Sequence, residues 1–244
     1  RRLKITQILE AQSRDATRMA HVAQSKAQCA AQDNSGVELL SRFRETLDVT
    51  WLKDELGQWG RQPGYKSYGG VNGQMFLNQL VNSSPDPDVL GRLLARCLAV
   101  PANPAAAARA INDLAEHTAM VKRGAHPAPR RAIFFLSFFW SVQRHSEWPC
   151  FWTSAEKMVN RLGWLEGSDD YGQLYLNFRE VLLTHGDPDD VEHALHYLED
   201  EKFLGLDASI VDRCRRNLQM ADAMVDDQYV DDESARRAAA NARA

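Results

Sequence analysis

The sequence predicts an all-α protein, folded as an irregular bundle of about ten helices around one buried aromatic helix. Three observations carry this prediction. Apolar residues recur at three- and four-residue spacing along most of the chain, as in Leu39, Leu40, Phe43 and Leu47. No stretch alternates apolar and polar residues between hairpin turns, as strands do. Residues 132–142 (AIFFLSFFWSV) are apolar on every side, which favours a helix covered all round.

The first third of the chain predicts helices separated by one irregular segment. Residues 3–32 are rich in the helix formers Ala, Gln, Lys and Arg, with only a thin apolar stripe, so we expect a long helix that packs on something else. Asn34 or Ser35 is predicted to cap a second helix, and Thr50 a third. Residues 57–73 hold six glycines and are predicted to form a loop.

Later helix starts have clearer signals. Pro87 and Pro104 follow Asp86 and Asn103, the pattern of an N-cap with proline in the first turn. Residues 153–156 (TSAE) match a capping box, and the helix that follows is predicted to stop at Gly163. Helices with apolar faces are also predicted after Tyr171, Asp187-Pro188 and Asp207.

Charge suggests a division of the chain into parts. Residues 1–165 carry a net charge of +7, from 21 Lys and Arg against 14 Asp and Glu, whereas residues 166–244 carry −11, from 8 against 19. We therefore expect a long N-terminal helix (1–33), a helical core lobe (34–165) and an acidic helical lobe (166–244). The asymmetry fits a nucleic-acid face on the basic part, attraction between the two parts, or solvated surfaces alone.

Composition excludes several classes of protein. With 44% hydrophobic and 25% charged residues, the chain has the balance of a globular protein. No apolar run approaches the roughly 20 residues that span a bilayer, and the first thirty residues hold no secretory signal, so we expect no membrane association. The four scattered cysteines predict reduced thiols in the cytoplasm rather than disulfides or a zinc site. The start at Arg1 and the Ala/Arg-rich end suggest a piece of a longer polypeptide.

No catalytic signature emerges. The glycine-rich segment lacks the Lys-Ser/Thr pair of a P-loop, because Gly70 and Val71 stand in those places, so a plain loop is favoured over a phosphate site. No G-x-S-x-G elbow is present. Cys150 lies between Pro149 and Phe151, where we expect burial and hence an inert thiol.

Two polar clusters are candidate metal sites. His193 and His196 have H-x-x-H spacing beside Asp189 and Asp190, but without an obvious third ligand we favour surface histidines. The carboxylates between Asp226 and Glu233 could hold magnesium, as in all-helical terpenoid synthases, although a solvated acidic face is the favoured interpretation. The sequence therefore predicts no catalytic residue, no metal ligand and no cofactor.

One basic segment is a candidate binding site. Residues 122–131 (KRGAHPAPRR) hold Lys122, Arg123, His126, Arg130 and Arg131. Basic groups bind nucleic-acid phosphates, and exposed aromatic side chains stack on bases. Such aromatics follow in the sequence: Phe134, Phe135, Trp140, Trp148 and Trp152. The alternative is a solvated loop over an aromatic core, with its arginines paired to the acidic lobe.

A resemblance adds to this interpretation. The sequence HPAP at 126–129, FFLSFFW at 134–140, Trp148-Pro149, TSAEK at 153–157 and LGWL at 162–165 follow one another in order. Over about residues 70–185 this resembles the helical N-terminal regions of large bacterial restriction and anti-phage defence proteins, including AAA-type ATPases akin to the methylcytosine-specific restriction subunit. The resemblance implies a helical sensor or adaptor module ahead of an NTPase or nuclease whose own motifs are absent here.

Three functional hypotheses follow. The first is a non-catalytic sensor or adaptor module of a bacterial defence or restriction protein, which contacts DNA or a partner subunit through the basic segment. The second is a protein–protein assembly scaffold that uses residues 3–32 and the polar tail, with a homo-oligomer as one form of assembly. The third is an all-helical magnesium-dependent enzyme that uses the Asp226–Glu233 cluster.

Overall fold

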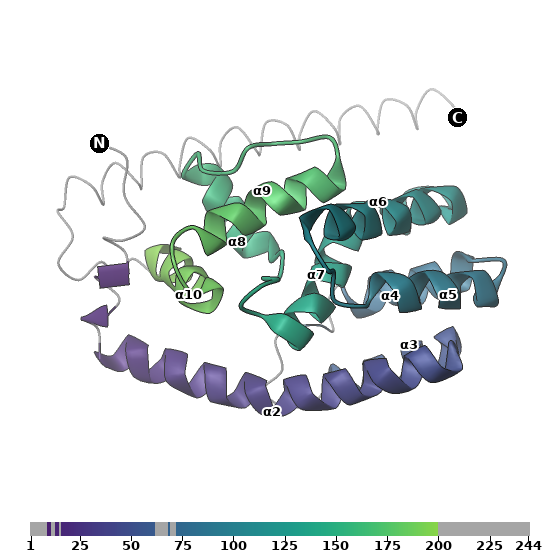
Figure 1. The fold of residues 1–244 in the computed structure, drawn as a ribbon, viewed down its shortest axis with the longest axis horizontal. Coiled ribbons are helices and arrows are strands. Elements are labelled where there is room, and N and C mark those ends of the chain that lie inside the picture. The colour runs from purple at the N-terminus through teal and green to yellow at the C-terminus, as the bar shows by residue number, and fades with distance from the viewer. Residues whose placement is uncertain (1–8, 11–12, 15, 62–67, 69–71, 200–244) are drawn as a thin grey trace, which may run out of the picture.

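The computed structural model describes residues 9–10, 13–14, 16–61, 68 and 72–199. These residues form helices joined by short connections and contain no strand, which confirms the all-α prediction (Figure 1). The helices are α2 (Ala16–Thr46), α3 (Val49–Trp59), α4 (Gln74–Ser83), α5 (Pro87–Cys97), α6 (Pro104–Val121), α7 (Arg131–Arg144), α8 (Thr153–Arg161), α9 (Tyr171–Leu183) and α10 (Pro188–Glu199).

Helix α7 forms the centre of the structure. All its residues from 132 to 142 are buried, as the apolar run predicted. Its rings meet edge to face, an arrangement favoured by their quadrupoles: the centroids of Phe138 and Phe139 lie 5.2 Å apart at 89°. The indole of Trp140 is fully buried and donates a hydrogen bond to the Cys97 carbonyl at 2.9 Å. The buried aromatic helix is therefore confirmed.

The other helices cover α7 from several sides. The long helix α2 runs along one side of the molecule, with α3 folding back beside its C-terminal end (Figure 1). Helices α6 and α9 pack on one another and on α7, and α10 packs on α8 and α9. One hydrophobic cluster runs from Leu40 on α2 to Leu195 on α10.

Several helix starts form as predicted. The Asp86 carboxylate accepts hydrogen bonds from the amides of Asp88 and Val89 at 2.9 and 3.0 Å, at the start of α5. The Asn103 side chain caps α6 through the Ala106 amide at 2.9 Å. Gly163 has a φ of 67°, the left-handed conformation that ends α8.

The predicted boundary at Asn34 or Ser35 is wrong, because α2 runs through both residues without a break. The Ser35 hydroxyl accepts a hydrogen bond from the Trp59 indole at 2.9 Å and does not cap a helix. A Cβ on Gly36 would lie 2.7 Å from the same indole. Tertiary packing of α3 against α2 thus holds together a segment whose local sequence favours a break.

Three further local predictions are corrected. Asp48, not Thr50, caps α3, because its carboxylate accepts from the amides of Thr50 and Trp51. Thr153 is the first residue of α8 and makes no capping bond; its hydroxyl accepts from the Asn72 amide at 3.1 Å. The predicted loop from Gly57 begins later, since α3 extends to Trp59.

The contact between α6 and α9 joins the core lobe to the described part of the acidic lobe. The backbone of Gly172 touches α6 so closely that a Cβ there would lie 2.5 Å from the Ala108 carbonyl oxygen. Its amide donates to the Asn112 side chain at 2.9 Å, and Asn112 also donates to the Asp170 carboxylate. The division at residues 33 and 165 stays a prediction, but the described helices on both sides of 165 share one core.

Replacing Gly172 by alanine should destabilise the fold by about 1–3 kcal/mol, because the added methyl group forces α9 away from α6. Urea unfolding followed by circular dichroism measures the change. Gly167→Ala is the matched control, since a Cβ at Gly167 meets no atom within 4 Å. Equal stability of the two variants would contradict the close packing of α6 and α9.

Candidate nucleic-acid interface

The basic connection, residues 122–131, is a tight turn between α6 and α7. The backbones of Arg123 and His126 face each other, with the Arg123 amide donating to the His126 carbonyl at 2.9 Å. Gly124, at the tip, has a φ of 64°, a conformation that glycine adopts without strain. Pro127 is buried, so the turn is anchored to the body of the protein. The turn therefore presents its basic side chains from a fixed backbone.

The predicted basic residues differ in exposure and in partners. Lys122, Arg123 and His126 are exposed, and neither Lys122 nor Arg123 forms an ion pair with any residue that the structure describes. Arg130 has 45% of its side chain exposed and pairs with Glu156 of α8. Arg131 is half-buried and donates to the Gln79 side chain at 3.3 Å. The turn thus holds two cations in solvent and two that are partly engaged.

The aromatic side chains that follow the turn do not form a stacking surface. Phe134, Phe135, Trp140 and Trp148 are at most 6% exposed, and only Trp152 is half-buried. The predicted role as stacking partners for bases is therefore wrong for those four residues, because their side chains are buried in the core. The candidate interface that remains is electrostatic.

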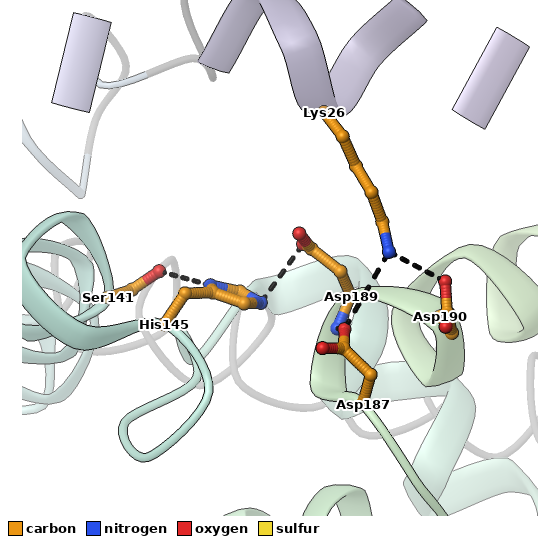
Figure 2. A network of polar contacts seen from close by, with 6 residues as sticks. All are labelled: Lys26, Ser141, His145, Asp187, Asp189 and Asp190. Carbon is orange, nitrogen blue, oxygen red and sulfur yellow. Dashed lines mark hydrogen bonds and ion pairs between the residues drawn. The ribbon is translucent and has the colours of Figure 1, made fainter. Parts of the chain in front are cut away.

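A second polar constellation links three helices (Figure 2). The ammonium group of Lys26 on α2 lies 2.8 Å from Asp190 and 3.8 Å from Asp187, at the start of α10. His145, at the end of α7, has Nε2 3.0 Å from Asp189 and Nδ1 2.7 Å from the Ser141 hydroxyl. The network therefore joins α2 and α7 to the first turn of α10, the described part of the acidic lobe.

This network contains the side chains of a hydrolytic triad, Ser141, His145 and Asp189, within hydrogen-bonding reach of one another. Ser141 is only 9% exposed and lies one turn before His145 on the same central helix. A substrate carbonyl would need access to its hydroxyl oxygen, and the packing of α7 denies that access. The geometry favours a role in holding α10 to the core.

The thiols are equally poor nucleophiles. Cys97 and Cys150 are buried thiols rather than disulfides, and burial was predicted for Cys150. Burial raises the pKa of the Cys97 thiol to about 11, so the thiolate is scarce at neutral pH.

Lys26, Ser141 and His145 were not identified as partners of α10 from the sequence. Lys26 and Asp190 are 164 residues apart, and no local pattern pairs them. Attraction between the basic and acidic parts was one interpretation of the charge asymmetry in the sequence. The ion pairs of this network are an example of such attraction. Of the two histidines with H-x-x-H spacing, His193 is partly exposed.

Other sequence candidates fall partly or wholly outside the described residues. The Asp226–Glu233 cluster lies outside them, as do residues 62–67 and 69–71 of the glycine-rich segment. Within the described part of the chain, no group of three or more His, Cys, Asp or Glu side chains is arranged to hold a metal ion. Among the helices described, none has both the length and the hydropathy to cross a bilayer.

Comparison with family models, with curated proteins and with solved structures gives no match to this chain.

The pKa of Lys26 gives a prediction for stability. Burial lowers this pKa, but the hydrogen bond and charge of Asp190, with Asp187 and Asp189, outweigh burial and raise it above 10.5. Lys26→Met should lower the free energy of unfolding by less than about 1 kcal/mol at pH 7, because the ammonium is partly exposed. The difference should persist below pH 10.5 and vanish as the pH rises through the raised value.

Urea unfolding of both proteins between pH 7 and the alkaline limit measures this difference. Lys157→Met is the control, since Lys157 is exposed and makes no ion pair with a described residue. A Lys26→Met effect that stays constant through the alkaline range would show that packing of the side chain, not its charge, stabilises the fold.

Proposed function

We propose that this chain is a non-catalytic helical module that binds nucleic-acid phosphates through the basic connection. The observation that supports this most is the pair Lys122 and Arg123, which are exposed, adjacent and without an ion pair among the described residues. A cation that makes no salt bridge keeps its charge available for phosphate, and binding releases counterions from the nucleic acid. Arg130 and Arg131 extend the positive strip toward α7.

The rigidity of the turn supports the same proposal. Its backbone pairing between Arg123 and His126, together with buried Pro127, fixes the positions from which the cations project. Phosphate contacts from fixed positions set the register of a protein on a nucleic acid without reading its sequence. The module would therefore supply binding and orientation, with sequence recognition supplied elsewhere.

The acidic groups described after residue 165 do not neutralise the tip of the turn. Asp187, Asp189 and Asp190 face Lys26 and His145 (Figure 2). Among the described residues, the carboxylate that forms an ion pair with the connection is that of Glu156 on α8, and its partner is Arg130. The alternative is that the acidic lobe neutralises the basic connection. Within the described residues, however, the acidic lobe pairs with α2 and α7, and not with Lys122 or Arg123.

The resemblance to helical regions of bacterial restriction and anti-phage proteins supplies the context that we propose, an adaptor within a defence protein. A cytoplasmic location belongs to this proposal, and the buried cysteines Cys97 and Cys150, which are thiols rather than disulfides, support it.

A protein–protein assembly scaffold is the second candidate. Helix α2 exposes Met19 and Val37, at 38% and 36%, and α6 exposes Met120 at 71%. Exposed apolar side chains on long helices suit a contact with another protein surface. Light scattering of the chain and of a Met19→Ser, Val37→Ser variant tests this candidate, which fails if both are monomers at every concentration.

The nucleic-acid proposal predicts salt-sensitive binding. Fluorescence anisotropy with a labelled DNA duplex should show affinity that falls steeply with salt. The double variant Lys122→Gln, Arg123→Gln should bind at least about tenfold more weakly, and the slope of log affinity against log salt should decrease by about 2, or about 1 per lost contact.

The double variant Arg92→Gln, Arg109→Gln is the matched control. Both arginines are exposed on other helices, and its formal charge equals that of the test variant. Equal losses in the two variants would mean that net charge alone drives binding, and absence of binding at low salt would remove nucleic acid from the function.

A further inference from the structure

A hollow of about 350 Å³ lies between α2 and α3, and none of its lining residues belongs to the basic connection. Half-buried Leu39 and Trp51 contribute apolar surface to its lining. Glu38 of α2 and Glu55 of α3 contribute two carboxylates to the same lining. All four side chains are at least partly exposed, so the hollow offers both apolar surface and negative charge to a partner.

The two carboxylates of this hollow have no cationic partner among the described residues. Glu38 precedes Arg42 by four residues on α2, a spacing at which opposite charges usually pair. The Arg42 guanidinium instead lies over the Trp51 ring, 4.8 Å from its centroid. Neither Glu38 nor Glu55 forms an ion pair with any residue that the structure describes. With Arg42 counted, two carboxylates and one guanidinium give the lining a net charge of −1, which favours a cationic partner.

A projecting surface of complementary chemistry lies at the end of α6. The side chain of Met120 is 71% exposed, more than any other large apolar side chain that the structure describes. Lys122 and Arg123 follow it in the sequence and are exposed without an ion pair among the described residues. Residues 120–123, which we call the α6 end, therefore present one apolar group and two cations within four residues.

We propose that the hollow between α2 and α3 binds the α6 end of a second copy of this chain. The two cations of the second copy pair with the two carboxylates, and its Met120 packs on the half-buried apolar side chains of the hollow. Arginine can bind a carboxylate through two parallel hydrogen bonds, and both methionine and arginine are enriched at protein–protein interfaces. The apolar contact excludes water beside the ion pairs, which strengthens their attraction.

The contact joins two different surfaces, so each bound copy still offers either a hollow or an α6 end to a further copy. Such a contact is heterologous and produces linear assemblies or a closed ring. The inference goes beyond the proposed nucleic-acid contact and does not rest on it, although both use Lys122 and Arg123. Nucleic acid and a second copy would compete for these cations, so nucleic acid would dissociate the assembly.

Sedimentation velocity of two neutralised variants tests the contact. Glu38→Gln, Glu55→Gln removes the charges of the hollow, and Lys122→Gln, Arg123→Gln removes those of the α6 end. The unaltered chain should associate reversibly at low salt as its concentration rises toward about 1 mM, because a contact with few ion pairs is weak. Each variant alone should associate at least about tenfold more weakly.

An equimolar mixture of the two variants gives the sharpest outcome. The first variant keeps its α6 end and the second keeps its hollow, so one working contact remains between them. The mixture should therefore form dimers with the affinity of the unaltered contact, and nothing larger. Carbodiimide cross-linking of labelled and unlabelled copies of the unaltered chain is a check that needs no variant. It should join Lys122 of one copy to Glu38 or Glu55 of the other.

Glu166→Gln, Glu180→Gln is the matched control for the hollow. Both glutamates are exposed outside the hollow, and the change in formal charge is the same, so this variant should associate as the unaltered chain does. Met120→Ser should weaken association with no change in charge. Circular dichroism checks that each variant keeps its helices.

Three results would overturn the inference. These are a monomer at every concentration at low salt, equal effects of the hollow variant and its control, and a mixture that stays monomeric. DNA binding by Glu38→Gln, Glu55→Gln separates this inference from the proposed function, because that variant keeps both cations and should bind DNA like the unaltered chain. Absence of self-association with intact DNA binding would contradict this inference alone, and the reverse result would contradict only the nucleic-acid proposal.

Discussion

The burial of α7 on all sides is the constraint on which the rest of the structure depends. A helix with apolar residues around its whole circumference has no face that it can leave in water, so other helices must surround it. Helices α2, α6 and α9 do so directly, although they are far apart in the sequence. Edge-to-face contacts order Phe135, Phe138 and Phe139 within this helix, and the contact between Trp140 and Tyr175 links it to α9. The aromatic residues are thereby committed to the core, which is why they leave no stacking surface for bases.

The ends of α7 meet solvent in different ways, and this difference organises the polar surface. At its start, the basic connection presents Lys122 and Arg123 and borders a pocket lined by Arg130, Arg131 and Glu156. At its end, His145 meets the first turn of α10, where Lys26 also binds (Figure 2). At the second end, opposite charges pair across helices, while at the first end Lys122 and Arg123 form no ion pair with a described residue. Part of the charge asymmetry of the sequence therefore holds helices together, and part of it stays in solvent.

The proposal of nucleic-acid contact rests on that first end. Nucleic-acid contact needs only exposed cations at fixed spacing, and its affinity comes from counterion release.

The sequence by itself determined the helical class, the central apolar helix and the helix starts at Asp86-Pro87 and Asn103-Pro104, because periodicity and capping chemistry are local properties. It also determined that residues 122–131 would carry concentrated positive charge. Only the tertiary structure decided that α2 continues through Asn34 and Ser35, where the indole of Trp59 from another helix donates a hydrogen bond to the serine hydroxyl. It alone brought Lys26 to Asp190, and it alone divided the basic residues into the exposed Lys122 and Arg123 and the engaged Arg130 and Arg131. These outcomes depend on contacts between residues distant in the chain, and their partners are fixed only once the helices have packed around α7.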